Sequence, residues 1–244
     1  MCTLIVAFQQ HPDAPVVVAA NRDEVRDRPA TGLRRWPGEA FLAPRDEQAG
    51  GTWLGLTRSG LFVGVTNRFP SEKHPERESR GRLVVDALRA PSARALHAAL
   101  SVLEPRRYNA FHLLYVDAHA AGVTWSDGQA LHQETLTPGL HVVTERSLGG
   151  DDHARRALIL EAWPRLAPGG DLPSPEALQG LLALKRPGEP LGSVCVDAPE
   201  WNYGTRSALV LYLRRPLASS RLYWADGSPD RAPFVERGDL LAGW

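Results

Sequence analysis

The chain has 244 residues, which is long enough to bury a substantial apolar core. Its 28 lysines and arginines equal its 28 aspartates and glutamates, so no net field favours nucleic acid or an anionic membrane. Two cysteines, Cys2 and Cys195, are too few for a disulfide framework and fit a reducing compartment. The sequence shows no secretory signal and no apolar window of the ~18 residues needed to span a bilayer. We expect a cytoplasmic protein without a nucleic-acid partner or a membrane span.

Short apolar runs dominate the first part of the chain. Residues 3–8 form one such run, and 15–20 form a second run after a turn at 9–12, which predicts a hairpin. Further strands are predicted at 51–56, 61–66, 111–116, 121–125, 141–144, 207–213 and 221–224. Several are joined by short polar turns, which indicates antiparallel pairing.

Helical patterns cluster in the middle of the chain, at 80–88, 92–103, 152–166 and 175–184. The last of them has Ser174 as N-cap and Pro175 at its first helical position. Strands come first, helices mix with strands next, and strands return at the end. This order predicts an α+β layered fold in which the two ends of the chain share a sheet, with residues 1–244 as one domain.

Cys2 is the first candidate for chemistry. Removal of Met1 would leave one residue that carries both a thiol and a free α-amine. Their ordinary pKa values, roughly 8.5 and 7.7 to 8.0, are close enough for the amine to accept the thiol proton at neutral pH. The alternative is that Cys2 is only a small second residue with an inert thiol.

A second candidate is the polar run from Asn21 to Glu24, which the predicted hairpin places beside Cys2. A carboxylate there would hold the α-amine, and an arginine would favour the thiolate. The alternative is a solvated, charged turn.

Two later positions have similar chemistry. Asn67 closes an apolar strand with an amide donor, the kind of group that stabilises an oxyanion together with a backbone N–H, or it is an ordinary turn asparagine. Arg206 precedes a late apolar strand, where it serves a thiolate, binds a substrate carboxylate, or makes a structural ion pair. The sequence contains no zinc-protease helix, CxxC pair, phosphate loop or dinucleotide fingerprint, so we expect no metal and no cofactor.

Several motifs in order resemble the NRDE family, whose eukaryotic members are called transport and Golgi organisation protein 2. They are Met1-Cys2 before an apolar strand, Asn21-Arg22-Asp23-Glu24, Pro44-Arg45-Asp46, Gly50 to Gly55, Thr66-Asn67, Ser79-Arg80-Gly81, Tyr108-Asn109 and Tyr203 to Ser207. The resemblance implies a four-layer αββα sandwich of antiparallel sheets, like the N-terminal-nucleophile hydrolases. Characterised relatives of that kind include cysteine amidases such as bile salt hydrolase and penicillin V acylase.

The resemblance also implies roles for individual residues. Cys2 looks like the nucleophile, Arg22 and Asp23 like the arginine and aspartate of the amidases, Asn67 like the oxyanion-hole asparagine, and Arg206 like their late arginine. Glu24 is an alternative for the carboxylate role, because the amidases space their arginine and aspartate by three residues. Glu145 stands where the family usually has an asparagine, and a carboxylate there cannot donate to an oxyanion. We expect Asn21, Glu24, Glu145 and Trp53 to contact the substrate.

Two functions remain open from the sequence. The first is an N-terminal-cysteine hydrolase that cleaves a C–N bond in a small, non-peptide linear amide. The second is a non-catalytic carrier of haem, lipid or acyl-CoA on the same fold. Either function implies a small-molecule substrate or ligand, and the oligomeric state is left open.

Overall fold

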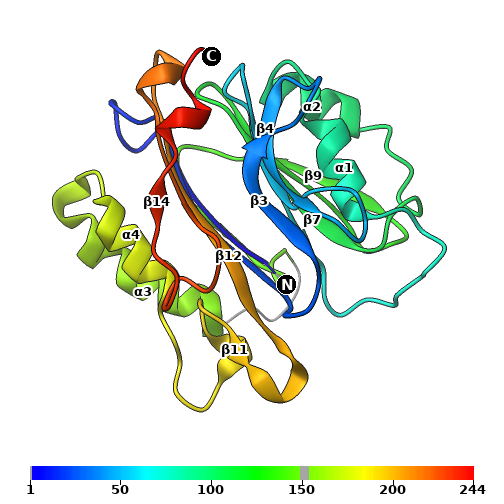
Figure 1. Cartoon of the computed structure of the whole chain (residues 1–244). Helices are drawn as coiled ribbons and strands as arrows, with labels where there is room; N and C mark the ends of the chain where they lie inside the picture. Colours follow the sequence, from blue (N-terminus) through cyan, green and yellow to red (C-terminus); the bar gives the residue numbers. More distant parts are fainter. Residues whose placement is uncertain (1, 149–153) are drawn as a thin grey trace.

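A computed structural model of the chain describes residues 2–148 and 154–244. Two antiparallel sheets pack face to face, and helices cover the outer face of each sheet, which gives four layers (Figure 1). The predicted αββα sandwich is therefore confirmed. None of the helices in the described part of the chain is long and apolar enough to cross a membrane.

The first sheet joins the two ends of the chain. Its strand order is β10-β1-β2-β12-β13-β14, with β11 paired to β12. The strands are β1 (Cys2–Phe8), β2 (Val16–Val25), β10 (Gly139–Val143), β11 (Asp197–Ala198), β12 (Tyr203–Leu213), β13 (Arg221–Ala225) and β14 (Val235–Glu236). The predicted hairpin is β1 and β2, and β2 continues through the polar run up to Val25. That run is therefore part of a strand and not a turn.

The second sheet follows the chain without a crossover, in the order β3-β4-β5-β6-β7-β8-β9. Its strands are β3 (Ala30–Arg35), β4 (Phe41–Asp46), β5 (Leu54–Thr57), β6 (Phe62–Asn67), β7 (Phe111–Val116), β8 (Ala121–Ser126) and β9 (Leu131–Thr135). The sequence analysis missed β3, β4 and β9. Strands β3 and β9 lie at the sheet edges with mostly polar or exposed side chains, and β4 contains Pro44, so none shows a clear strand pattern.

Helices α1 (Arg80–Ala87) and α2 (Ala93–Leu100) cover the second sheet, and α3 (Ala154–Leu166) and α4 (Pro175–Leu182) cover the first (Figure 1). The predicted start of the third helix, at 152, falls outside the described residues. Short 3-10 turns occur at Pro168–Gly170, Pro190–Gly192, Pro199–Trp201, Leu217–Ser219 and Gly238–Leu240. Ser79, Ser92 and Ser174 cap α1, α2 and α4 by accepting a hydrogen bond from a first-turn amide.

Strand β1 is buried on both faces. Leu4 and Val6 pack between the two sheets, whereas Ile5 and Ala7 pack under α3 and α4. Each fully buried aliphatic side chain of this kind contributes about 1.5–3 kcal/mol. This packing fixes the start of the strand, where a chain terminus would otherwise fray.

Candidate active site

Cys2 begins β1 and lies directly opposite Arg22 of β2. Alternation along each strand places both side chains on the face between the sheets, the face that also carries Leu4. The Cys2 side chain is buried, with 8% of its surface exposed, and it lines a cavity of about 530 Å³. We call this space the Cys2 cavity.

Three parts of the chain form the walls of the Cys2 cavity. The first sheet contributes the start of β1 and the end of β2, the second sheet contributes the ends of β4 and β6 and the residues just before β5, and the segment before α1 with the first turn of α1 closes the third side. The main lining residues from these parts are Cys2, Arg22, Glu24, Arg28, Asp46, Trp53, Val65, Asn67, His74, Arg77, Glu78, Arg80 and Asn109.

Burial raises the pKa of the Cys2 thiol to about 11. The charges of Asp23 and Glu24 add to this rise, and the guanidinium of Arg22 opposes it. The thiol is therefore protonated at neutral pH in this environment. Its use as a nucleophile requires a base close enough to remove the proton.

Arg22 is held by acidic residues that also line the cavity. Its Nη2 atom lies 3.4 Å from Asp46 and 3.8 Å from Glu24, and Arg28 donates to the same Asp46 oxygen at 2.7 Å. Burial acts to raise the pKa of Asp46, but the hydrogen bonds from Arg28 and from the Ala49 amide outweigh it and leave that pKa below its usual range. Asp46 thus remains charged and fixes both arginines.

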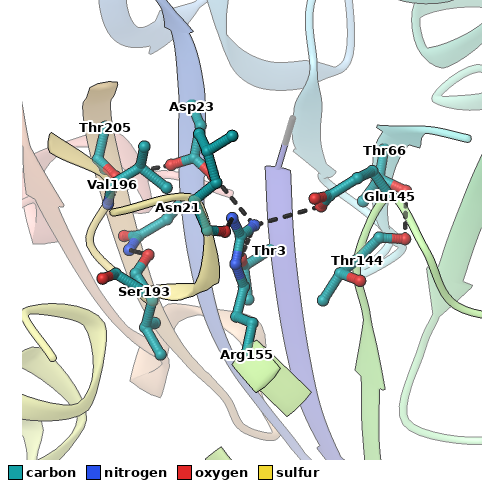
Figure 2. A network of polar contacts seen from close by, with 12 residues as sticks. Thr3, Asn21, Asp23, Thr66, Thr144, Glu145, Arg155, Ser193, Val196 and Thr205 are labelled. Carbon is teal, nitrogen blue, oxygen red and sulfur yellow. Dashed lines mark hydrogen bonds and ion pairs between the residues drawn. The ribbon is translucent and has the colours of Figure 1, made fainter. Parts of the chain in front are cut away.

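Asp23 points to the opposite face of β2, toward α3. Figure 2 shows it between Thr205, which donates to it at 2.6 Å, and Arg155, which donates to it at 3.2 Å. The same Nη1 atom of Arg155 lies 3.1 Å from the Thr3 hydroxyl and 3.3 Å from Glu145. Burial raises the pKa of Asp23, and the Arg155 charge opposes that effect. The network ties α3 to the ends of both hairpin strands.

Glu145 belongs to this buried network and does not line the Cys2 cavity. Its carboxylate faces Arg155 (Figure 2), and its backbone carbonyl accepts a hydrogen bond from the Phe69 amide at 2.7 Å. The positive charge of Arg155 offsets the carboxylate. Arg155 also pairs with Asp23, so two buried carboxylates share this one guanidinium.

Asn67 ends β6 with an exposed side chain that lines the cavity. The preceding residue, Thr66, anchors the strand end, because its hydroxyl donates to the Thr144 carbonyl at 3.1 Å and lies 3.0 Å from His112 Nδ1. The end of β6 is thus fixed, while the Asn67 amide remains available to a ligand. Trp53 and Glu24, which the sequence analysis predicted as substrate contacts, also line the cavity.

Two predicted site residues lie elsewhere. Asn21 faces the helices, where its Nδ2 atom donates to the carbonyls of Leu182 and Val194, each at 2.9 Å. Arg206 sits at a β-bulge of β12, where the pairing with β2 shifts by one residue. Its Nη1 atom donates to three backbone carbonyls of the β2–β3 connection, Val25, Arg26 and Arg28, and it does not line the Cys2 cavity. Both residues hold backbone segments in place.

The sequence profile of a family described as Transport and Golgi organisation 2 matches residues 1–172. The chain belongs to the Transport and Golgi organisation 2 family. A homologue of that name from Bos taurus is 26% identical over 247 residues, covering 86% of this chain and 88% of the relative. A homologue from Mus musculus is 27% identical over 125 residues, covering 48% of this chain and 45% of the relative.

Two solved structures resemble the chain along most of its length. The Caenorhabditis elegans orthologue of N-acylethanolamine-hydrolyzing acid amidase superposes with a TM-score of 0.59 at 14% identity, covering 86% of this chain and 92% of that one. A mutant of the conjugated bile acid hydrolase from Clostridium perfringens gives 0.62 at 11% identity, covering 100% and 94%. At these identities the likeness shows the fold, which is that of the N-terminal-nucleophile hydrolases.

Sequence reasoning did not assign site roles to several residues of the Cys2 cavity, including Asp46, Arg77, Arg80 and Asn109. The Asn109 side chain accepts from the His74 amide at 2.8 Å and donates to the His74 carbonyl at 2.9 Å, which anchors the segment before α1. Three of these residues lie in motifs that carry the resemblance to the family, namely 44–46, 79–81 and 108–109. These motifs were the signal in the sequence that could have identified the three residues as part of the site.

The cavity also bears on metal binding. Within residues 2–148 and 154–244, no group of three or more histidine, cysteine, aspartate or glutamate side chains is arranged to hold a metal ion. His74 lines the cavity, but its ring nitrogens lie 3.3 Å from Glu76 and 3.7 Å from Glu72, both mostly exposed. The hydrogen-bond donors that line the cavity include the guanidinium groups of its arginines and the side-chain amides of Asn67 and Asn109, which suit oxygen-bearing organic ligands.

Proposed function

We propose that the chain is an N-terminal-cysteine hydrolase that cleaves the C–N bond of a small, non-peptide linear amide. Cys2 is the nucleophile in this proposal, once Met1 has been removed. The observation that carries it is the position of Cys2, opposite Arg22 at the wall of a cavity that Asn67 also lines. Nucleophile, cation and amide donor therefore meet at one site.

The first step is removal of the thiol proton. A thiol with a pKa of about 11 has almost no thiolate at pH 7. The α-amine of a processed Cys2, with an ordinary pKa of roughly 7.7 to 8.0, accepts this proton and leaves the sulfur free to attack the amide carbonyl. The register places the Cys2 backbone against Arg22, and the next residue of β2 is Asp23, so we assign to the Asp23 carboxylate the role of holding the amine.

The second step stabilises the negative charge that develops on the carbonyl oxygen. As the C–S bond forms, the carbonyl electron pair moves onto oxygen, where the Asn67 amide and a backbone N–H donate to it. The α-ammonium then gives its proton to the leaving amine as the C–N bond breaks. Water, deprotonated by the same amine, attacks the thioester and releases the carboxylic acid and the free thiol.

The names of the two structural neighbours support a C–N reaction, because one is an acid amidase and the other a conjugated bile acid hydrolase. The names of the family relatives concern transport and Golgi organisation and state no reaction. The reaction therefore remains our proposal from the site.

The alternative is a carrier of haem, lipid or acyl-CoA. Sites for large apolar ligands are lined mainly by hydrophobic and aromatic side chains. The Cys2 cavity is lined mainly by charged and amide side chains, with Trp53 and Val65 as its larger apolar residues. This composition favours a small polar substrate over a bulky apolar cargo.

Turnover by a processed chain tests the proposal. The protein is produced with a cleavable extension before Cys2, the extension is removed, and the new terminus is verified by intact mass. Release of amine from a panel of N-acyl amides is then followed. We expect turnover by the processed chain and a loss of at least about 100-fold in Cys2→Ala and in the extended form. Saturable ligand binding that Cys2→Ala leaves unchanged, without product from any amide, would contradict the hydrolase and favour the carrier.

A further inference from the structure

We infer that the amide substrate carries a small anionic group, a carboxylate or a phosphate, and that Arg77 and Arg80 bind this group in the Cys2 cavity. That the bound molecule is a substrate rests on the proposed hydrolase function. The binding site itself rests on charges and contacts in the cavity wall. We call these two residues the arginine pair.

The charges that line the cavity divide into two groups. Arg22 and Arg28 share Asp46 and Glu24, with distances between 2.7 and 3.9 Å, so this wall is close to neutral. The part of the wall formed by the segment before α1 and the first turn of α1 contains the arginine pair. An incoming anion therefore gains little at the first wall and has to be attracted by the second.

The arginine pair binds backbone carbonyls and no carboxylate in the described part of the chain. Arg80 Nη1 donates to the Ala110 carbonyl at 2.9 Å, and Arg77 Nη1 donates to the Tyr108 and Gly128 carbonyls, each at 3.3 Å. These bonds fix each guanidinium group but do not neutralise it. The Nε and Nη2 atoms of both side chains make no hydrogen bond to the described residues, which leaves the planar fork that suits a carboxylate or a phosphate.

The other acidic residues that line the cavity form ion pairs with arginines outside it, and the Arg155 partner of Asp23 is shared with Glu145. Glu78 forms a two-point ion pair with Arg107, at 2.8 and 3.2 Å. Asp23 points to the far face of β2, where Arg155 pairs with it. Among the residues that the structure describes, Arg77 and Arg80 are thus the charged residues of the cavity lining without an ion pair.

Two observations place the positive charge of Arg80 near the Cys2 thiol. Burial lowers the pKa of Arg80, while the charges of the Cys2 thiolate and Glu24 raise it, so this guanidinium and the thiolate interact. Helix α1 begins at Arg80 and has no acidic residue in its first turn, and Ser79 and Gly81 line the cavity as well. The positive end of the helix therefore adds to the field of the two arginines.

A pair of alkylating agents measures this field at Cys2. Iodoacetate and iodoacetamide have nearly the same shape and react with the same thiolate, but only the first is an anion. The ratio of their rates at one pH therefore cancels the thiol pKa and reports the local attraction for an anion. The reference is the same ratio for a short peptide that begins with Cys-Thr-Leu.

We expect the ratio for Cys2 in the processed chain to exceed the peptide ratio by at least about tenfold, and to fall as salt is raised. It should drop at least about fivefold in Arg80→Gln and in Arg77→Gln, because each removes one charge. Arg82→Gln is the matched control: Arg82 lies on the same helix, is 60% exposed, pairs with Asp86 and does not line the cavity. Protection of Cys2 by acetate or by inorganic phosphate, at equal ionic strength, distinguishes the two anions.

A peptide-like ratio in the wild-type chain, or a raised ratio that neither arginine variant lowers, overturns the inference. The result is independent of turnover. A raised, arginine-dependent ratio without hydrolysis of any amide supports the anion site and contradicts the hydrolase. Equal kcat/KM for N-acetylglycine and its neutral amide, together with a peptide-like ratio, supports the hydrolase and overturns the anion site.

Discussion

Cys2 is a nucleophile candidate in a site that suppresses its thiolate. With a pKa of about 11, roughly one thiol in ten thousand is ionised at pH 7. Arg22 opposes the suppression, and Asp23 and Glu24 reinforce it. Reactivity at neutral pH therefore has to come from a base within reach, which is the reason that the α-amine is central to our proposal.

Substitutions at Asn67 test the proposed stabilisation of the oxyanion. Asn67→Ala removes the proposed side-chain donor to the oxyanion, so kcat should fall by about 10²–10³ with little change in KM. Asn67→Asp keeps the size of the side chain and should lose at least as much, because a carboxylate accepts and cannot donate. Steady-state kinetics on the best amide of the panel measures both. A variant of either kind with wild-type kcat would exclude Asn67 from the reaction.

Arg155 tests the buried network. Arg155→Met leaves Asp23 and Glu145 buried without their shared cation, and we expect a loss of about 3–5 kcal/mol in the free energy of unfolding. Adding Glu145→Gln to Arg155→Met should recover at least about 1 kcal/mol, because the Glu145 charge that the first change leaves unpaired is then also removed. Urea unfolding measures both variants. Arg165→Met, at an exposed pair with Glu161, is the control and should change stability by less than about 0.5 kcal/mol.

Among the elements, the first hairpin was the most predictable. Continuous apolar runs predicted β1 and β2, and their pairing placed Cys2 beside Arg22. Alternation along β2 then decides which polar residues reach the cavity: Arg22 faces it, whereas Asn21 faces α4 and the 182–194 backbone. The sequence analysis placed the polar run beside Cys2 at the end of the second strand, with a charged turn as the alternative, and did not separate the two faces of that strand.

Helix α1 is positioned by a close backbone contact. A Cβ atom added to Gly51 would lie 2.4 Å from the Gly81 carbonyl carbon, and the Thr52 amide donates to the Gly81 carbonyl at 3.2 Å. Gly51→Ala should therefore displace the start of α1 and cost about 1–3 kcal/mol. Gly180→Ala is the control: the site within α4 is open, and the change should stabilise by up to about 1 kcal/mol. Thermal unfolding measures both, and equal effects would contradict the contact.

At the scale of the whole molecule, the site is assembled from distant parts of the chain. The cavity combines Cys2 of β1, Asn67 of β6 and Arg80 of α1. These residues come together because the two sheets pack face to face. Local sequence pattern predicted these three elements but not the packing between the sheets. Arg206 shows the limit clearly, because one bulge in β12 decides where its side chain lies, and no spacing in the sequence signals that bulge.

Buried His112 makes the stability of the sandwich sensitive to acid. Burial and the charge of Arg68 lower the pKa of His112 from 6.5 to about 4. Between these values the unfolded chain binds a proton that the folded chain excludes, so stability is complete above about 6.5 and falls as the pH drops toward 4. The loss from this group is up to about 3 kcal/mol. Urea midpoints of wild type and His112→Gln from pH 7 to 4 measure it, and parallel curves would contradict it.

The most direct test of the central claim compares Cys2 alkylation in two forms of the chain. One form carries an extension before Cys2, and the other has been processed to a free Cys2 terminus, verified by intact mass. In the extended form we expect the iodoacetamide rate to keep rising with pH toward the thiol pKa of about 11. The processed form should react at least about tenfold faster at pH 7, with an inflection near the α-amine pKa of roughly 7.7 to 8.0. Identical pH profiles in the two forms would contradict the role of the α-amine.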